Sequence, residues 1–271
     1  MAATTIVPAE ATSARDDPIT ICAISCLAWI LAAVSHEGIG HALVALLTGT
    51  QTGVLSTVAW SSAYDSRLVA AGGTLVNLIE AGVLWLALRS LKSASPRLRL
   101  FLCLGFAFNL FTGTGYFLFS GAFDFGDWAQ VIARTHPHWL WRFLLVTVGA
   151  AAYYGAVRAV AVGVVRYVGV LPSEYLRLRK VNLTTYFSAI VLSVAGALMN
   201  PLGFKLVLES ALPAAAGANC AFLWLRYYIP RGTLPVRDSD SISRGYAWIA
   251  MAAVLSLVFV FVLGRGITLN R

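Results

Sequence analysis

Charged residues are scarce in this chain. Of its 271 residues, 12% are Asp, Glu, Lys or Arg and 59% are hydrophobic. Soluble globular domains contain about 25% charged residues, so the composition argues against a soluble protein. The net charge of +8 does not indicate a nucleic-acid partner, because the basic residues cluster in short loops between apolar runs. We expect a multi-pass integral protein of a cell membrane that contacts the lipid bilayer and binds no nucleic acid.

A disulfide framework, a signal peptide and internal repeats are also lacking. The four cysteines all lie in apolar runs, so we expect them to be buried as small hydrophobic side chains. Residues 1–18 are polar and lack the basic region and apolar core of a cleavable signal peptide. No separate soluble domain is visible. The chain is therefore divided into a polar tail at 1–18, a three-helix membrane core at 19–128 and additional transmembrane helices at 129–271.

Seven apolar runs are candidates for membrane spans. They cover about residues 19–47, 68–88, 98–119, 139–165, 186–208, 212–229 and 246–263. The fifth run is interrupted by Asn200-Pro201, so the fifth and sixth runs could form one broken pair. The predicted fold is an all-α polytopic membrane protein with six or seven transmembrane helices.

The stretch between the first two runs differs from its neighbours. Residues 51–66 are too polar and too short to span a bilayer. Val54, Thr57, Val58 and Trp60 predict one or two short strands there. Open strand edges cannot lie in lipid, so we expect a short interfacial β segment between the first two helices.

The distribution of basic residues predicts the orientation. With seven spans, thirteen Lys and Arg residues fall on the side of the N-terminus and six on the other side; with Arg158 inside a span, these account for all 20. The excess predicts a cytoplasmic N-terminus. His41 then lies near the far end of the first helix, and the loop at 124–127 emerges on the same side.

Two histidines and a glutamate lie inside the first apolar run, in the order His36-Glu37, two glycines within the next three residues, then His41. Ionisable groups at membrane depth usually face a partner or a water-filled cavity, and they indicate function by default. In zinc proteases two such imidazoles hold the metal while the glutamate activates water. We therefore favour a metal site over a polar cluster that only fixes helix packing.

The spacing of these residues differs from the common H-E-x-x-H motif. Three residues, not two, separate Glu37 from His41. Residues five apart on a regular α-helix differ by about 140°, so His36 and His41 would not share a face. A π-bulge would bring them together, and Gly38 and Gly40 allow the backbone to deform. If both histidines bind one metal, the helix is expected to depart from α geometry between them.

Three acidic residues are candidates for a third ligand. Asp127 is preferred over Asp124, because a flexible glycine precedes it and an anchoring tryptophan follows it. Glu80 is held in reserve, since it lies three residues after Asn77 and so shares a helix face with it.

These residues together resemble the site-2 protease family of intramembrane zinc metalloproteases. The resemblance covers about residues 19–128, where the family has three core spans and an interfacial strand segment. It implies that His36 and His41 bind Zn²⁺ and that Glu37 is catalytic. It further implies that Asp127, or less closely Asp124, is the third ligand, and that Asn77 helps to hold the substrate backbone.

The sequence departs from the family pattern at three points. The histidine motif is one residue longer, and this form is similar to that of soluble zinc dipeptidyl peptidases of the dipeptidyl-peptidase III type. The acidic motif lies farther from Asn109 than is usual in the family. The family also places its site nearer the cytoplasm, whereas the charge distribution here places it nearer the outside.

The resemblance implies an intramembrane zinc metalloprotease that hydrolyses peptide bonds in or near membrane segments of other proteins. Two alternatives remain from the sequence. One is a metal-binding or metal-transporting membrane protein, with His36, Glu37, His41 and Glu80 lining a pathway. The other is a catalytically inactive relative of the protease that binds membrane partners.

Overall fold

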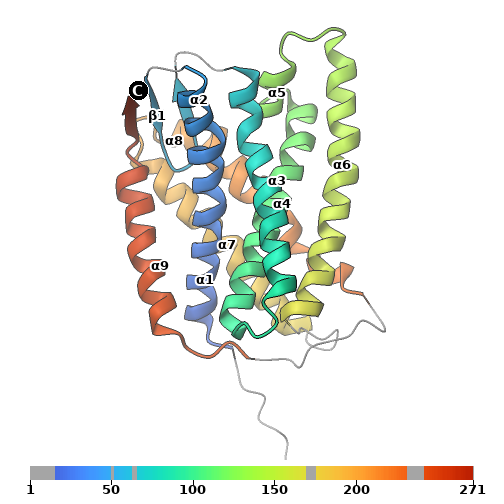
Figure 1. The fold of residues 1–271 in the computed structure, drawn as a ribbon, viewed down its shortest axis with the longest axis vertical. Helices are drawn as coiled ribbons and strands as arrows, with labels where there is room; N and C mark the ends of the chain where they lie inside the picture. The colour runs from blue at the N-terminus through green and yellow to red at the C-terminus, as the bar shows by residue number, and fades with distance from the viewer. Residues whose placement is uncertain (1–15, 50–51, 63–65, 169–174, 231–240, 271) are drawn as a thin grey trace, which may run out of the picture.

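The structure, a computed structural model, describes residues 16–49, 52–62, 66–168, 175–230 and 241–270. Within them, six helical stretches are long and apolar enough to cross a membrane, and they stand side by side as a bundle (Figure 1). The stretches are α1 (Pro18–Val34) continued by η1 (Ser35–Leu43) and α2 (Val44–Leu47), α3 (Arg67–Ser90), α4 (Pro96–Phe123), α6 (His138–Gly163) continued by η2 (Val164–Val168), α7 (Tyr175–Met199), and α9 (Tyr246–Val258) continued by η8 (Phe259–Leu263).

Capping signals in the sequence fix where three of these helices begin. The side chain of Asp17 accepts a hydrogen bond from the backbone N–H of Thr20 at 2.8 Å and so caps α1. Ser66 caps α3 and Ser95 caps α4 in the same way. These side chains satisfy backbone N–H groups that have no partner within the helix. Proline follows the cap of α1 and of α4, a position where its fixed φ suits a helix start.

Ion pairs tie the starts of several helices together. Asp16 pairs with Arg177 at the start of α7 at 2.7 Å, and Asp17 pairs with Arg244, just before α9, at 2.8 Å. Helix α4 begins at the same end (Figure 1). We call this the N-terminal end of the bundle. Helices α3 and α6 run in the opposite direction, and residues 204–228 return the chain to the N-terminal end between α7 and α9.

The fifth and sixth predicted spans differ from the structure. Helix α7 begins at Tyr175, earlier than predicted, and ends at Met199. It stops before Pro201, which cannot continue a helix and disfavours helical geometry in the residue before it. Five short helical pieces follow instead of a sixth long helix: α8 (Phe204–Leu206), η4 (Val207–Ala211), η5 (Pro213–Gly217), η6 (Cys220–Leu223) and η7 (Leu225–Tyr228). In the described part of the chain, the number of long apolar helices is thus six, the lower of the two predicted values.

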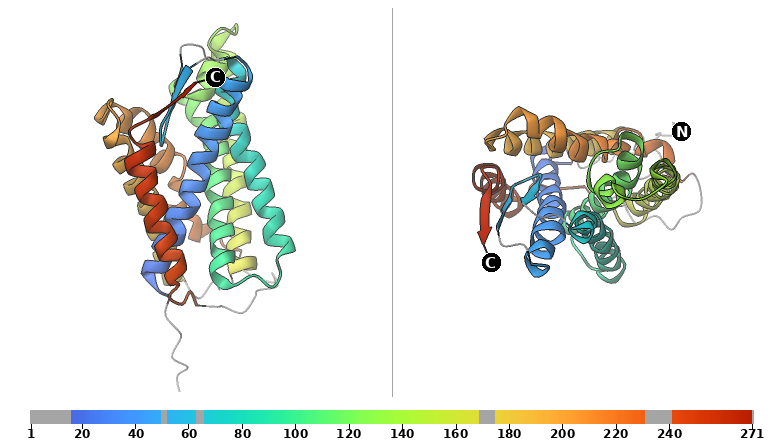
Figure 2. Two further views of the ribbon diagram at one scale, coloured as in Figure 1. Left: turned by 60° about the vertical axis from the view of Figure 1, so that its left-hand side comes forward. Right: turned by 90° about the horizontal axis from the view of Figure 1, so that it is seen from above.

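Seen along the bundle axis, α1 and α4 lie between the outer helices (Figure 2). Helix α4 is the most buried of the six long stretches, and its aromatic residues Phe108 and Phe111 are fully enclosed in the core. Phe222, from the broken stretch after α7, packs edge-on against both rings. The broken stretch therefore belongs to the main core although it is not a long helix.

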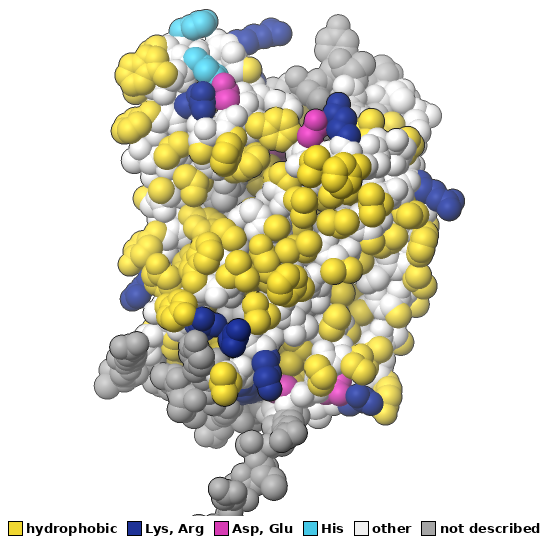
Figure 3. Space-filling model, turned by 180° about the vertical axis from the view of Figure 1, so that it is seen from behind, with side chains coloured by type: hydrophobic (Ala, Val, Ile, Leu, Met, Phe, Trp, Pro, Cys, Tyr) yellow, Lys and Arg dark blue, Asp and Glu magenta, His cyan; other side chains and the backbone are white. Residues whose placement is uncertain are grey.

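Large hydrophobic side chains also cover the outside of the bundle. Ile79 and Val83 of α3 and Leu257 of α9 are each more than half exposed. On the face opposite to that of Figure 1, hydrophobic side chains fill the middle while Lys and Arg gather toward the two ends (Figure 3). A broad apolar belt between charged ends is typical of proteins that lie in a bilayer.

A three-stranded antiparallel sheet lies at the other end of the bundle, which we call the sheet end (Figure 1). Its order is β2 (Trp60–Ser62), β1 (Thr52–Leu55) and β3 (Ile267–Asn270), and Val54 pairs with Ser61 on one side and Thr268 on the other. The predicted β segment between the first two long helices is present. The third strand, from the C-terminal residues, was not predicted.

The cysteines only partly follow the expectation. All four are free thiols, and Cys103 is buried in the core as expected. Cys22 is exposed, although its Sγ lies 3.4 Å from Oγ of Ser188 in α7. Cys26 and Cys220 are partly buried.

Candidate metal centre

The histidine motif lies in a π-helix near the sheet end. The nine residues of η1 have this wider geometry, between regular α-helix on both sides. His36, Glu37 and His41 are all buried there, and the two imidazole rings lie 4.8 Å apart, nearly perpendicular to each other. The predicted departure from α geometry is confirmed, although it extends over more residues than a single bulge near Gly38 and Gly40.

Glycines let α3 approach this helix closely. A Cβ atom on Gly40 would collide with the backbone of Gly73, and one on Gly72 would collide with the carbonyl oxygen of Gly40. A Cβ atom on Gly73 would lie 2.5 Å from Nε2 of both His36 and His41. Gly73 therefore leaves open the space into which both rings point.

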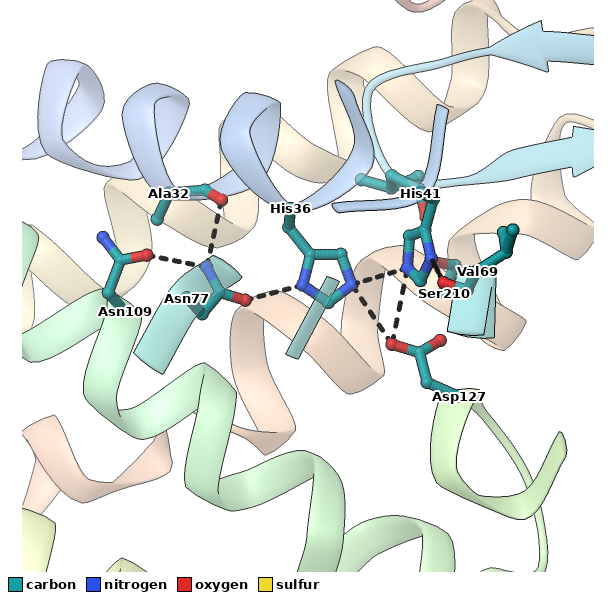
Figure 4. Close-up of polar contacts among 9 residues, drawn as sticks. Ala32, His36, His41, Val69, Asn77, Asn109, Asp127 and Ser210 are labelled. Atoms are coloured by element: carbon teal, nitrogen blue, oxygen red, sulfur yellow. Dashed lines mark hydrogen bonds and ion pairs between the residues drawn. The ribbon is translucent and has the colours of Figure 1, made fainter. Parts of the chain in front are cut away.

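Asp127 completes the group. After α4 ends, Asp124 adopts the left-handed conformation (φ 54°) and Gly126 also has a positive φ (86°), so the chain reverses. Asp127 follows as the first residue of α5 (Asp127–Ile132). Its Oδ2 lies 3.3 Å from Nε2 of His36 and 3.5 Å from Nε2 of His41 (Figure 4).

Hydrogen bonds on the far side of each ring fix which nitrogen carries the proton. Nδ1 of His41 lies 2.7 Å from the carbonyl oxygen of Val69, which can only accept, so Nδ1 carries the hydrogen. The amide nitrogen of Asn77 donates to Asn109 at 2.7 Å and to the carbonyl of Ala32 at 3.2 Å. The oxygen of Asn77 therefore faces Nδ1 of His36, at 2.6 Å, and accepts its hydrogen (Figure 4).

Both Nε2 atoms consequently present lone pairs toward each other, 3.1 Å apart, and toward the Asp127 carboxylate. Three such lone-pair groups this close repel one another unless a proton or a metal cation lies between them. His36, His41 and Asp127 thus could hold a metal ion, and hydrogen-bonding the far nitrogen of a ligating histidine is the usual way to orient it.

The carboxyl of Asp127 is suited to this role. Burial alone raises its pKa, but when no metal is bound, a hydrogen shared with the Nε2 atoms of His36 and His41 outweighs burial and holds the pKa below its ordinary value. The carboxylate is therefore ionised at neutral pH, as a metal ligand must be.

Glu37 lies beside the three donors but is not one of them. The backbone N–H of Trp60, in strand β2, donates to its carboxylate. The second carboxylate oxygen of Glu37, Oε2, is buried and has no hydrogen-bond partner among the described residues. Glu37, His41 and Asp127 line one cavity of about 220 Å³.

The rest of this cavity is mainly apolar. Its walls include Phe119 and Phe125 near the α4–α5 turn and Leu206 and Pro213 from the stretch after α7. Tyr116 also lines it and stacks on His36, with ring centres 5.1 Å apart. No Lys or Arg lies among the described residues that line the cavity.

Three other predicted site residues lie near the group without joining it. Asn77 is fully buried with its amide bonded as described, so its predicted contact with substrate stays a prediction. Asp124 faces His138 and Arg142. Glu80 lies beside Ser35 and Asn109, deeper in the bundle. Among the described residues, only Asp127 of the three acidic candidates belongs to the group with the two histidines.

Several contributors were not assigned from the sequence. The carbonyl of Val69 and the N–H of Trp60 are backbone groups, so no residue type could signal them. Gly73 and Asn109 had a signal, a paired glycine and a polar residue inside apolar runs, but their partners depend on how the helices pack.

Comparison of the chain with known family profiles, with curated proteins and with solved structures gave no significant match.

Proposed function

We propose that this protein is a zinc-dependent peptidase embedded in a membrane, of the site-2 protease type. One observation carries the proposal: His36, His41 and Asp127 converge beside a buried oxygen of Glu37 that has no partner among the described residues, and Glu37, His41 and Asp127 line the same cavity. A centre built only to bind metal does not need that fourth group. A water-activating base next to the ligands is what metal-assisted hydrolysis requires.

The donor set suits zinc and also iron(II), and the glutamate beside it, which can activate water, favours zinc. Two imidazole nitrogens and one carboxylate occur together in many catalytic zinc sites, which leave a fourth position for water or substrate. Sites for magnesium or calcium consist of oxygen ligands instead. Zinc bound by His36, His41 and Asp127 would supply a Lewis acid that polarises the scissile carbonyl and lowers the pKa of water.

Glu37 would carry the proton in this reaction. It accepts a proton from the attacking water as the new carbon–oxygen bond forms, and it returns that proton to the amide nitrogen as the carbon–nitrogen bond breaks. The N–H of Trp60 holds the carboxylate in place. The π geometry of η1 allows Glu37 to lie on the cavity side together with His41.

The surroundings support a peptide from a membrane segment as the substrate. The cavity is mainly apolar, and the outer surface of the bundle carries the apolar belt expected of a lipid-embedded protein. Strand β2, an edge of the described sheet, contributes Trp60 both to the cavity wall and to Glu37. An extended peptide that added to β2 as a further strand would pass beside Glu37.

The test is to separate metal binding from catalysis. Purified protein in detergent is compared with Glu37→Gln and with the double variant His36→Ala/His41→Ala, using a panel of single-span membrane peptides as substrates. We expect Glu37→Gln to keep zinc and lose cleavage, and the double variant to lose both. Equal zinc content in wild type and double variant would contradict the metal centre.

The same variants address the two alternatives. Zinc binding without cleavage of any peptide by the wild type would favour the inactive relative. If instead vesicles containing the wild type take up Zn²⁺ and those containing His36→Ala/His41→Ala do not, the protein transports metal. The convergence of the described donors at one point near the sheet end supports the peptidase over a row of ligands across the bundle.

A further inference from the structure

A second polar cluster lies at the sheet end, between α4 and α6. Nε2 of His138 lies 3.0 Å from each carboxylate oxygen of Asp124, and the guanidinium of Arg142 lies 3.6 Å from Oδ2. Arg142 also donates to the carbonyl oxygens of Gly121 and Ala122 at 3.0 and 2.9 Å. We call Asp124, His138 and Arg142 the α4–α6 clamp.

The clamp acts on the part of the chain that places the third ligand. The two carbonyls that Arg142 binds are in the last turn of α4, where backbone oxygens lack partners within the helix. Asp124 follows directly and starts the reversal that ends at Asp127. The clamp thus fixes both the end of α4 and the first residue of the turn against α6.

Asp124 holds a conformation that its side chain helps to maintain. Among the described residues other than glycine, only Asp124 has a positive φ. Residues with a Cβ rarely adopt this left-handed conformation, although Asp and Asn tolerate it better than most. The contacts with His138 and Arg142 favour it, because they form only when the carboxylate points toward α6.

We propose that the α4–α6 clamp positions Asp127 for metal binding, so that Asp124, His138 and Arg142 are positioning residues of the centre. The inference rests on the proposed function. A second anchor of the turn, the packing of Trp128 on Phe117 with ring centres 4.5 Å apart, limits the effect that loss of the clamp can have.

The key variant is Asp124→Gly. Glycine adopts a positive φ freely, so this change removes the clamp carboxylate without adding backbone strain. We expect zinc affinity to fall by about three- to tenfold, less than the loss typical of a group bonded directly to a ligand, because the clamp is partly exposed. Asp124→Asn tolerates the left-handed conformation and keeps an acceptor for His138, so it should recover part of the affinity. His138→Ala tests the clamp without any change at residue 124.

Two measurements are made on the full chain in detergent: zinc affinity by competition with a chromophoric chelator, and hydrogen exchange of the backbone at 124–128. Arg244→Ala is the matched control, because it breaks an ion pair with Asp17 at the opposite end of the bundle. It should change stability but neither measurement. We expect Asp124→Gly and His138→Ala to speed exchange at 124–128 and to weaken zinc binding.

Unchanged zinc affinity in both clamp variants, beside a wild type that binds zinc, would overturn the inference. So would unchanged exchange at 124–128. A wild type that binds no zinc would overturn the metal centre itself, and the exchange measurement would still decide whether the clamp holds the turn.

Discussion

The two ends of the helical bundle use their polar residues in opposite ways. At the N-terminal end, Asp16 and Asp17 each have an arginine partner, at 2.7 and 2.8 Å. At the sheet end, two imidazole nitrogens and the Asp127 carboxylate face one another with lone pairs. The first arrangement is complete within the chain and serves the fold. The second brings three potential ligands of a metal ion together, which makes it the candidate site.

The two arrangements also differ in their effect on the stability of the fold. The partly exposed ion pairs at the N-terminal end contribute little to stability, as is usual for such pairs. Buried polar groups without partners cost about 1–3 kcal/mol each. Among the described residues, Oε2 of Glu37 and Oδ2 of Asp127 at the sheet end are such groups. Violations of the rule that buried polar groups are paired are expected mainly at functional or strained sites.

The largest effect is expected from Gly73→Ala. The new methyl group would lie where Nε2 of His36 and His41 converge, so zinc affinity should fall by more than the roughly 10–100-fold typical of losing an outer-shell partner. Gly82→Ala, on the same helix, is the control, since a Cβ there meets no atom within 4 Å. Competition titration with a chelator measures both. Wild-type affinity in Gly73→Ala would mean that the metal does not bind between the rings.

A smaller effect is expected from Asn77→Ala. The variant leaves Nδ1 of His36 without its acceptor, so the ring can turn and change tautomer, and zinc affinity should fall by about 10–100-fold.

The control for Asn77→Ala is Asn219→Ala, which removes another fully buried amide, one bonded to Thr112 and the carbonyl of Ala214. Both variants should lose about 1–3 kcal/mol of stability because they leave buried groups unpaired. Only Asn77→Ala should lose zinc affinity. Equal affinities in the two variants would show that Asn77 does not orient the ligand.

The smallest effect concerns the N-terminal end and pH. Hydrogen bonds from Thr20, followed by Arg244, lower the pKa of Asp17. A carboxyl whose pKa is lowered by folding contributes stability above its unfolded pKa of about 3.9, and this contribution is lost as the pH falls toward the folded value.

Asp17→Asn should therefore unfold at a lower temperature than wild type at pH 6, with the difference shrinking toward pH 3. Asn caps helices about as well as Asp, so the difference reports the charge. Thermal unfolding in detergent across this pH range measures it, with zinc affinity at pH 7 as the check that this end is independent of the site. A difference that stays constant with pH would rule out the ionised carboxylate as its cause.

The sequence predicted the fold best where local signals are strong. The first long stretch, expected at 19–47, is observed at 18–47, and the last, expected at 246–263, is observed with those bounds. Both are long, mainly apolar runs with polar or glycine residues at their ends. Helix α7 was misplaced because its first turns are polar, yet Leu178 and Val181 are buried and Arg177 has its partner in Asp16, just before α1.

Long-range packing set the other limits. Strand β3 is four residues long, and its place beside β1 depends on the last residues of α9 and η8 leading the chain back to the sheet end. The π geometry of η1 was predictable because the spacing of His36 and His41 demands it. The choice of Asp127 over Asp124 agrees with the group that the structure brings together, but the reason lies in the turn, where Asp124 faces α6 instead.

The most direct test of the metal centre is the zinc content of the purified chain after saturation and removal of free metal, measured by mass spectrometry for wild type and for single variants of the three acidic candidates. We predict about one zinc per chain in wild type, Asp124→Ala and Glu80→Ala, and none in Asp127→Ala, because three protein ligands are the minimum for a stable catalytic site. Full zinc content in Asp127→Ala, with loss in Asp124→Ala or Glu80→Ala, would contradict the site described above.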